Sequence, residues 1–368
     1  MKSSSALLLP GLSEEAILRW MVLILSFLIG GVAGIFAVVI AQLLMNLSKK
    51  FGRNDTSRFG GVVVVAFFFL SQMWFVGTAG LFEMSSQAMA MMAAGMVLFA
   101  YGVYQEIFGA FPLKVSFIVL VVFFAGLLIT NEGLVLQATS FEWFDGLLAE
   151  HAMLAIVCTV LMLAYSVFAF NTANGANGLV PVVSIFSVIG LAQIGLGGMG
   201  SMLSLVAVGC VIFMLFNITI GRIYIGSGGT YFLGGVLGLA FVHVLNLQQV
   251  DIWYLLCLFF YPNANLLFSL VRRLSAGKAF FGDDNGHLHN LLYRRLSQYT
   301  LVKKRANTLA GIMVSAVFTG LPLALANTQG QYNWLLVYAL LWALYAVAWG
   351  MLADRKTKEV DFLRAASQ

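Results

Sequence analysis

Residues 272–296 read RRLSAGKAFFGDDNGHLHNLLYRRL, and this polar stretch stands between two long apolar runs. It holds two aspartates, two of the chain's four histidines and five of its twenty lysines and arginines. The flanking runs, 252–270 and 306–325, are each long enough for an α-helix to cross a bilayer. Because a polar segment of this length has to contact water, the contrast predicts membrane spans joined by a hydrophilic, histidine-containing loop over residues 271–305.

The composition of the whole chain supports the same interpretation. Of its 368 residues, 61% are hydrophobic and 10% are charged, and the mean hydropathy is +0.94. A soluble domain carries about 25% charged residues. Backbone groups in lipid must be satisfied internally, and the apolar runs are too long and too uniform for the strands of a barrel. We therefore predict an all-α, polytopic helical bundle that forms one integral membrane domain over residues 1–368.

We expect about eleven transmembrane helices. We find no cleavable signal peptide, so the first span is expected to act as its own insertion signal. The predicted spans are 17–45, 61–78, 88–104, 115–130, 152–170, 179–197, 202–219, 230–246, 252–270, 306–325 and 333–352.

The positions of the basic residues predict the orientation. Eighteen of the twenty lysines and arginines lie in one set of connections or after Asp354, and only Lys2 and Arg19 precede the first span. The positive-inside rule then places the N-terminus outside and the C-terminus in the cytoplasm, as an odd number of spans requires. We expect a multi-pass protein of the inner (cytoplasmic) membrane. The net charge of +5 follows from this bias, so we expect no nucleic-acid partner. Three isolated cysteines within spans predict neither a disulfide nor a metal site.

Three further connections on the expected cytoplasmic side have an unusual composition. Residues 171–178 read NTANGANG, residues 226–230 read GSGGT before a span, and Gln105-Glu106 ends the third span. Glycine lets the backbone approach a ligand closely, and a helix N-terminus offers N–H groups to phosphate. Solvated turns between spans are the alternative interpretation.

The polar motifs follow one another in a specific order along residues 20–350. They are Arg58-Phe59-Gly60-Gly61; Gly102-x-x-Gln105-Glu106 with Lys114; Asn171-x-x-Asn174-x-x-Asn177-Gly178; Asn217 with Gly226-Ser227-Gly228-Gly229-Thr230; Pro262-x-x-Asn265; and Arg272-Arg273, Gly277-Lys278, Asp284, His287 and His289. This ordered set resembles the polyprenyl-phosphate N-acetylhexosamine-1-phosphate transferases. That superfamily includes the undecaprenyl-phosphate GlcNAc-1-phosphate transferases and the phospho-MurNAc-pentapeptide translocase.

The resemblance implies a transfer of a sugar-1-phosphate from a UDP-sugar to undecaprenyl phosphate, with release of UMP, in envelope polysaccharide synthesis. It also implies Mg²⁺, or Mn²⁺ in its place, on the diphosphate, because phosphoryl transfer needs this charge neutralised and Mg²⁺ prefers carboxylate and phosphate oxygens. The expected partners are polyprenyl phosphate, a UDP-sugar and the lipid bilayer, and a homodimer is a further expectation.

The sequence departs from the family at the acidic positions. Gln105, Glu106, Asn177, Ser227 and Asn265 stand where family members carry aspartates. Glu106 is the best remaining candidate for a metal ligand.

The resulting site prediction has two groups of residues. The expected catalytic residues are Glu106, Asp284, His287 and His289; the expected substrate-binding residues are Arg58, Lys114, Asn171, Asn174, Asn177, Asn217, Gly226, Ser227, Arg272, Arg273 and Lys278. For the histidines, a cytosolic loop in which they cap turns is the alternative.

Three function classes stay open from the sequence. The first is a sugar-1-phosphate transferase, which the fold and the loop favour. The second is a catalytically inactive relative that binds polyprenyl phosphate, a nucleotide sugar or a partner enzyme, which the missing acids favour. The third is an unrelated transporter, which predicts inverted internal repeats; we find none in the sequence.

Overall fold

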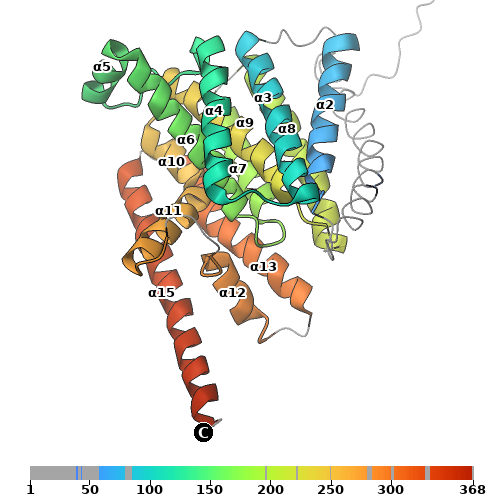
Figure 1. Ribbon diagram of the computed structural model, residues 1–368, viewed down its shortest axis with the longest axis vertical. Coiled ribbons are helices and arrows are strands. Elements are labelled where there is room, and N and C mark those ends of the chain that lie inside the picture. Colours follow the sequence, from blue (N-terminus) through green and yellow to red (C-terminus); the bar gives the residue numbers. More distant parts are fainter. Residues whose placement is uncertain are drawn as a thin grey trace, which may run out of the picture.

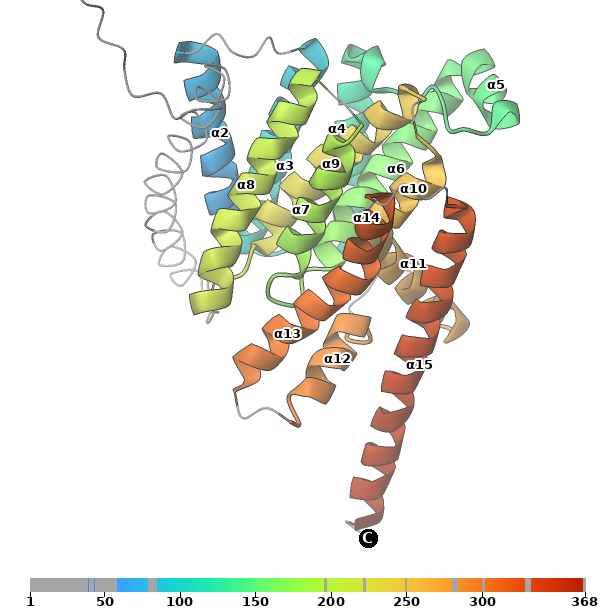
Figure 2. The ribbon, with the colours of Figure 1, turned by 180° about the vertical axis from the view of Figure 1, so that it is seen from behind.

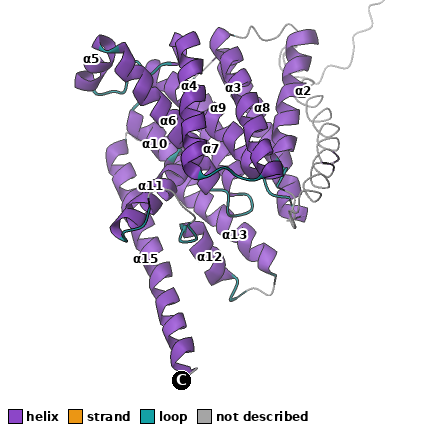
Figure 3. Cartoon of the chain, in the orientation of Figure 1, coloured by secondary structure: helices purple, strands orange, loops and turns teal. Residues whose placement is uncertain are grey.

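A computed structural model describes residues 39, 43, 58–78, 85–194, 197–220, 223–248, 250–279, 284–299, 302–327 and 332–366. Within these ranges the chain is helical and contains no strand (Figure 3). Most of the predicted first span, 17–45, lies outside them, as do Asp283 and Arg222. The helices are α2 (Gly61–Thr78), α3 (Ser86–Phe108), α4 (Leu113–Thr130), η1 (Glu132–Leu134), α5 (Glu142–Glu150), α6 (Ala152–Thr172), α7 (Leu179–Ala192), α8 (Gly197–Ile220), α9 (Gly226–Asn246), α10 (Ile252–Leu258), α11 (Phe260–Ser275), α12 (Leu288–Leu296), α13 (Lys303–Ser315), the π-helix η2 (Ala316–Gly320), α14 (Leu321–Ala326) and α15 (Trp334–Ala366).

The all-α membrane architecture is confirmed. Among the described residues, seven helices are long and apolar enough to cross a membrane, or eight if the bent pair α10–α11 counts as one span. Helix α7 and the apolar part of α2 are shorter. The chain is therefore a multi-pass membrane protein, while the full set of eleven spans and the orientation of the termini stay predictions.

Helix α9 is the centre of the bundle. Of its apolar window, 94% is buried, against 11% for α15 and 22% for α4. Helices α2, α3 and α6 pack around it. The polar loops on which the site prediction rests lie at one end of this bundle, where α12, the start of α13 and the long end of α15 project (Figures 1 and 2). Helix α5 lies at the opposite end (Figure 1).

The prediction of one uninterrupted span over residues 252–270 is wrong. The chain bends by 83° between α10 and α11. Pro262 has no N–H to give to the carbonyl of Leu258, one turn earlier, and its ring would clash there in a straight helix. The Ser187 hydroxyl of α7 donates to that carbonyl instead, at 3.2 Å. The bend turns α11 away from the bundle axis (Figure 1).

Other boundaries differ from prediction for local reasons. Where a span was predicted over residues 179–197, the observed helix α7 ends at Ala192 and a turn follows. The predicted span 306–325 contains the π-helix η2 just before Pro322, a residue type that forces such adjustments. Helix α15 continues well beyond the predicted end at residue 352. Helices α5 and α12, both too short to span a bilayer, lie in segments that the sequence left as loops.

Gly226 makes the tightest backbone contact near the polar end. Its φ is +71°, and a Cβ added there would lie 1.6 Å from the Arg58 carbonyl oxygen. The neighbouring segments pair through Gly60 N–H to Tyr224 O and Gly61 N–H to Ile225 O, both at 2.8 Å. The start of α2 is thereby attached to the start of α9.

We predict that Gly226→Ala destabilises the protein by more than about 3 kcal/mol, because the new methyl group must displace backbone. Gly277→Ala is the matched control, since Gly277 has a φ of +66° but open space around its Cβ position. It should cost only the backbone strain, about 1 kcal/mol. Thermal unfolding in detergent measures both, and equal losses would contradict the close approach.

Candidate functional site

Glu106 connects α3 to the first turn of α9. Its Oε1 accepts hydrogen bonds from the Ser227 backbone N–H and the Ser227 hydroxyl, both at 2.9 Å. The Glu106 side chain is 7% exposed. Gly102, one turn earlier on α3, makes this possible because a Cβ there would lie 2.5 Å from Ser227 O. Glu106 and Ser227, which were predicted separately as a catalytic and a substrate-binding residue, are therefore in direct contact and connect the two helices.

The neutral side chains of Gln105 and Asn265 also connect helices. Gln105 donates to the Ser116 hydroxyl of α4 at 3.2 Å and accepts from the Tyr231 hydroxyl of α9 at 3.4 Å. Asn265 of α11 donates to Thr172 of α6 at 3.5 Å and accepts from Tyr345 of α15 at 3.4 Å. Both amides are buried. Each of these amides thus forms hydrogen bonds with two other helices.

The asparagine-rich segment 171–178 is held in the same way. Asn171 accepts from Thr230 of α9 at 2.9 Å. The amide of Asn217 accepts the Gly178 N–H at 2.8 Å and donates to Asn177 Oδ1 at 3.4 Å and to Ile223 O at 2.6 Å. The Asn174 side chain is half-buried. Asn177 and Gly178 are thus bonded to Asn217, and Asn171 is bonded separately to α9.

Asp284 lies at the entrance of the histidine loop, paired with Arg272 of α11. Its Oδ2 accepts from the Arg272 guanidinium and the Ser269 hydroxyl, and its Oδ1 accepts the Gly286 N–H at 2.8 Å. Burial alone would raise the pKa of Asp284, but these three hydrogen bonds outweigh it and hold the pKa well below its usual range. Asp284 is therefore ionised at neutral pH and fixes the loop to α11.

The His289 side chain is buried in the protein, and only 1% of its surface is exposed. Its Nδ1 lies 2.8 Å from the Tyr261 hydroxyl, and its backbone N–H donates to the same oxygen at 3.3 Å. Because that oxygen accepts the backbone N–H, we assign its own proton to Nδ1, which leaves the imidazole proton on Nε2. Burial lowers the pKa of His289 to about 3, so the ring is neutral. A Cβ at Gly175 would lie 2.0 Å from Nε2, which brings the 171–178 segment against this ring.

His287 stacks on His289, with ring centroids 5.5 Å apart and planes inclined by 11°. Burial lowers the pKa of His287 as well, although the Asp284 carboxylate opposes the shift. The loop is closed on its other side by Trp349 of α15, whose Nε1 donates to Gly286 O at 2.8 Å. The guanidinium of Arg272 lies 5.6 Å from the Trp349 ring centroid.

The remaining lysines and arginines of the site prediction differ in how exposed they are. Arg58, Lys114 and Lys278 are exposed. Arg273 is buried and donates from Nε and Nη2 to Ala279 O, at 3.1 and 2.8 Å, so it holds the turn after α11. The first three are available to a charged ligand at the surface, and Arg273 is a structural residue of the loop.

The residues present do not fit a protein-held Mg²⁺. Mg²⁺ sites use carboxylate oxygens in octahedral geometry. Glu106 Oε1 is bonded to Ser227, and Asp284 is bonded to three donors elsewhere. Across the described ranges, no group of three or more His, Cys, Asp and Glu side chains is placed to hold a metal ion.

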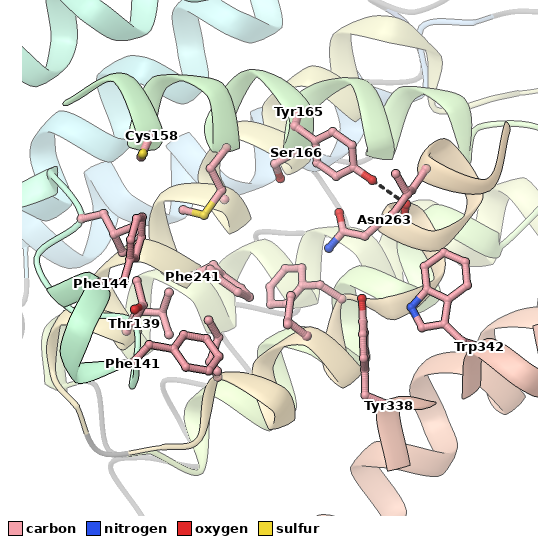
Figure 4. A pocket seen from close by; sticks show the side chains of 18 of the residues that line it. Thr139, Phe141, Phe144, Cys158, Tyr165, Ser166, Phe241, Asn263, Tyr338 and Trp342 are labelled. Atoms are coloured by element: carbon pink, nitrogen blue, oxygen red, sulfur yellow. Dashed lines mark hydrogen bonds between the residues drawn. The ribbon is translucent and has the colours of Figure 1, made fainter. Parts of the chain in front are cut away.

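An apolar cavity of about 600 Å³ lies between α5, α6, α9, α10, α11 and α15, and sequence analysis gave no indication of it. At one end are Phe141, Phe144 and Cys158, and at the other Tyr165, Asn263 and Trp342 (Figure 4). The Tyr165 hydroxyl donates to Asn263 O at 2.6 Å, so the bend of α11 forms the wall at that end. Pro262 is the only local signal that could have revealed it.

These features define a multi-pass membrane protein with a polar, loop-built site at one end of a helical bundle and an apolar cavity beside it. Residues 88–245, from α3 to α9, match the model of glycosyl transferase family 4. The match covers somewhat less than half of the chain, and it supports the superfamily of membrane polyprenyl-phosphate sugar-phosphate transferases. The search of curated proteins finds no match.

We predict that the protein loses stability as the pH falls from about 7.5 to about 5. His289 and His287 have lowered pKa values in the folded state. The unfolded chain therefore binds more protons below its ordinary histidine pKa of about 6.5, and each such group costs up to about 1.4 kcal/mol per pH unit. Asp284, whose pKa is also lowered, loses its contribution only below about pH 4.

The melting temperature measured across this pH range tests the assignment. His289→Gln should flatten the slope, whereas His151→Gln, at an exposed position before α6, should leave it as in the wild type. An unchanged slope in His289→Gln would show that the buried imidazole does not cause the effect.

Proposed function

We propose that this protein transfers a sugar-1-phosphate from a UDP-sugar to undecaprenyl phosphate at the cytoplasmic face of the inner membrane. The observation that carries the proposal is the position of α11. Its first turn borders the apolar cavity, and its last turn carries Arg272, which meets the histidine loop. A lipid that is apolar along its length and charged at one end matches that arrangement.

An exposed apolar stripe on α11 joins these two ends. Leu267, Val271 and Leu274 are 43%, 54% and 55% exposed and follow one another at helical spacing. From Asn263 to Arg272 the helix rises by about 14 Å. An isoprenoid tail lying along this stripe would reach the cavity while its phosphate stays near Arg272. The basic loops at this end support the cytoplasmic side through the positive-inside rule.

In the transfer itself, an oxygen of the lipid phosphate forms a bond to the β-phosphorus of the UDP-sugar, and the bond to the UMP oxygen breaks. The chain's residues would align the two phosphates and balance their charge. The exposed Arg58, Lys114 and Lys278 would attract the nucleotide diphosphate. The neutral, buried His289 would offer a hydrogen bond rather than a charge.

A second function is favoured by the hydrogen-bonded neutral residues. Gln105, Asn177 and Asn265 bond to neighbouring helices where the family has acids. A relative without catalysis, which binds polyprenyl phosphate or a nucleotide sugar, would need the same scaffold and the same loop but no acidic cluster.

A radiolabelled transfer assay separates the two functions. Purified protein receives undecaprenyl phosphate and a panel of UDP-N-acetylhexosamines, each with EDTA, Mg²⁺ or Mn²⁺. We expect a lipid-linked product that falls at least tenfold in His289→Gln, with Leu161→Gln, on the exposed face of α6, as the control. No product under any condition, together with retained lipid binding, would establish the non-catalytic relative.

The cavity makes a separate prediction about the lipid. Met162 lines the cavity and Met153 is 72% exposed on the same helix, α6. We expect Met162→Trp to fill the cavity and to weaken undecaprenyl phosphate binding at least tenfold, because about 1.4 kcal/mol of lost tail contact suffices for this. Met153→Trp should bind as the wild type does. Equal affinities of the two variants would show that the tail lies elsewhere.

A further inference from the structure

Three nitrogen atoms at the junction of α11 and α12 are buried without a hydrogen-bond partner. They are Arg272 Nε, His287 Nδ1 and His289 Nε2. Within the described part of the chain, only three other buried side-chain nitrogen or oxygen atoms lack a partner. Buried polar groups are nearly always paired, and leaving one unpaired costs about 1–3 kcal/mol. A cluster of three therefore calls for an explanation.

The chemistry of the cluster identifies the missing partner as an acceptor. An arginine Nε always carries a proton. His289 Nε2 carries one because Nδ1 is engaged by Tyr261. The negative charge in the cluster, Asp284, is already bonded to Arg272, Ser269 and Gly286. The site thus offers N–H donors and half-exposed guanidinium surface to a ligand that supplies acceptor oxygens.

The backbone around the cluster is shaped for close approach. A Cβ at Gly286 would lie 2.7 Å from Arg272 Nη2, and one at Gly175 would lie 2.0 Å from His289 Nε2. Both glycines therefore pack directly against these side chains, and a side chain at either position would clash with them. Trp349 contacts the Arg272 guanidinium, Tyr261 is bonded to the His289 ring, and Ser269 donates to Asp284, the partner of Arg272, so the donors are fixed before a ligand arrives.

We propose that this chain binds a phosphate group directly through Arg272, His287 and His289, without a divalent cation. The proposal rests on the proposed function for its two ligand sources, the head of a polyprenyl phosphate and the diphosphate of a nucleotide sugar. It is reinforced by the donor set, since the carboxylates that would hold Mg²⁺ are absent from the described residues or engaged elsewhere. Charge-assisted hydrogen bonds from arginine replace the cation.

The test is equilibrium binding to the full-length protein in nanodiscs, with no transfer step. Radiolabelled undecaprenyl phosphate forms one arm and radiolabelled UDP-N-acetylglucosamine the other, each with EDTA or with millimolar Mg²⁺. For at least one ligand we expect dissociation constants within twofold in the two conditions. The arm that binds identifies the source of the phosphate. Binding that requires Mg²⁺, or no binding of either ligand, would overturn the proposal.

Variants place the ligand at this cluster. We expect Arg272→Gln to weaken binding in EDTA at least tenfold, whereas Arg305→Gln, at an exposed position at the start of α13, should change it less than twofold. Equal losses would indicate general attraction to the basic surface and would overturn the assignment. Because Arg272→Gln leaves Asp284 without its partner, the double variant Arg272→Gln/Asp284→Asn removes both charges and should show the same loss.

Gly286→Ala supplies an independent check with the arginine retained. The added methyl group pushes the guanidinium aside, so binding should again fall at least tenfold, while Gly126→Ala, which has open space around it on α4, should have no effect. Wild-type affinity in Gly286→Ala would contradict the proposed geometry. Cation-independent binding without transfer leaves this inference intact and removes the transferase, whereas Mg²⁺-dependent binding with transfer does the reverse.

Discussion

Close packing against the glycines of α9 is the constraint on which the rest of the structure depends. Lipid gives no hydrophobic driving force between helices, so association relies on small residues that let backbones meet. A Cβ at Gly61 of α2 would lie 2.4 Å from Gly229 Cα, and one at Gly234 would lie 2.8 Å from Val167 Cα of α6. These contacts hold α2 and α6 against one central helix and bring the starts and ends of three spans together at the polar end.

Hydrogen bonds between polar side chains then fix how the packed helices are aligned along one another. Glu106 bonds to the first turn of α9 and Asn171 bonds to Thr230 one turn later, so α3 and α6 are aligned on α9 at the same height. In a medium without water, such bonds are formed within the protein. Buried amides suit this network because an amide donates as well as accepts and can pair with two helices, as Gln105 and Asn265 do.

The sequence was informative where the signal is local and periodic. The spans 61–78 and 115–130 correspond closely to α2 and α4, because a long apolar run has few alternatives to a helix in lipid. The resemblance singled out Glu106, Ser227, Asn177 and Asn217 one by one and predicted no contact between them. Their pairing in the structure, Glu106 with Ser227 and Asn177 with Asn217, did not follow from the spacing of the residues.

The features that the sequence could not reveal depend on distant partners. The bend at Pro262 is stabilised by Ser187, and the burial of His289 depends on Tyr261 and Gly175. Two histidines separated by one residue in a polar loop suggest exposure, yet the fold stacks them and covers them with segments from three other parts of the chain. The cavity is lined by residues of six helices that are distant in the sequence, so no single stretch of sequence indicates it.

The engaged carboxylates and the unpaired nitrogens of the histidine loop together bear on how the site would recognise a phosphate group. The glycines at 175 and 286 pack directly against His289 and Arg272, whose Nε2 and Nε atoms are buried without a hydrogen-bond partner. If the site worked through a protein-held cation, the carboxylates would not be taken up by serine and arginine. Both observations agree with the proposed recognition of phosphate by fixed N–H donors. A preorganised donor costs little reorganisation when a charged ligand arrives, so such a site keeps its selectivity for phosphate with fewer charges in the membrane.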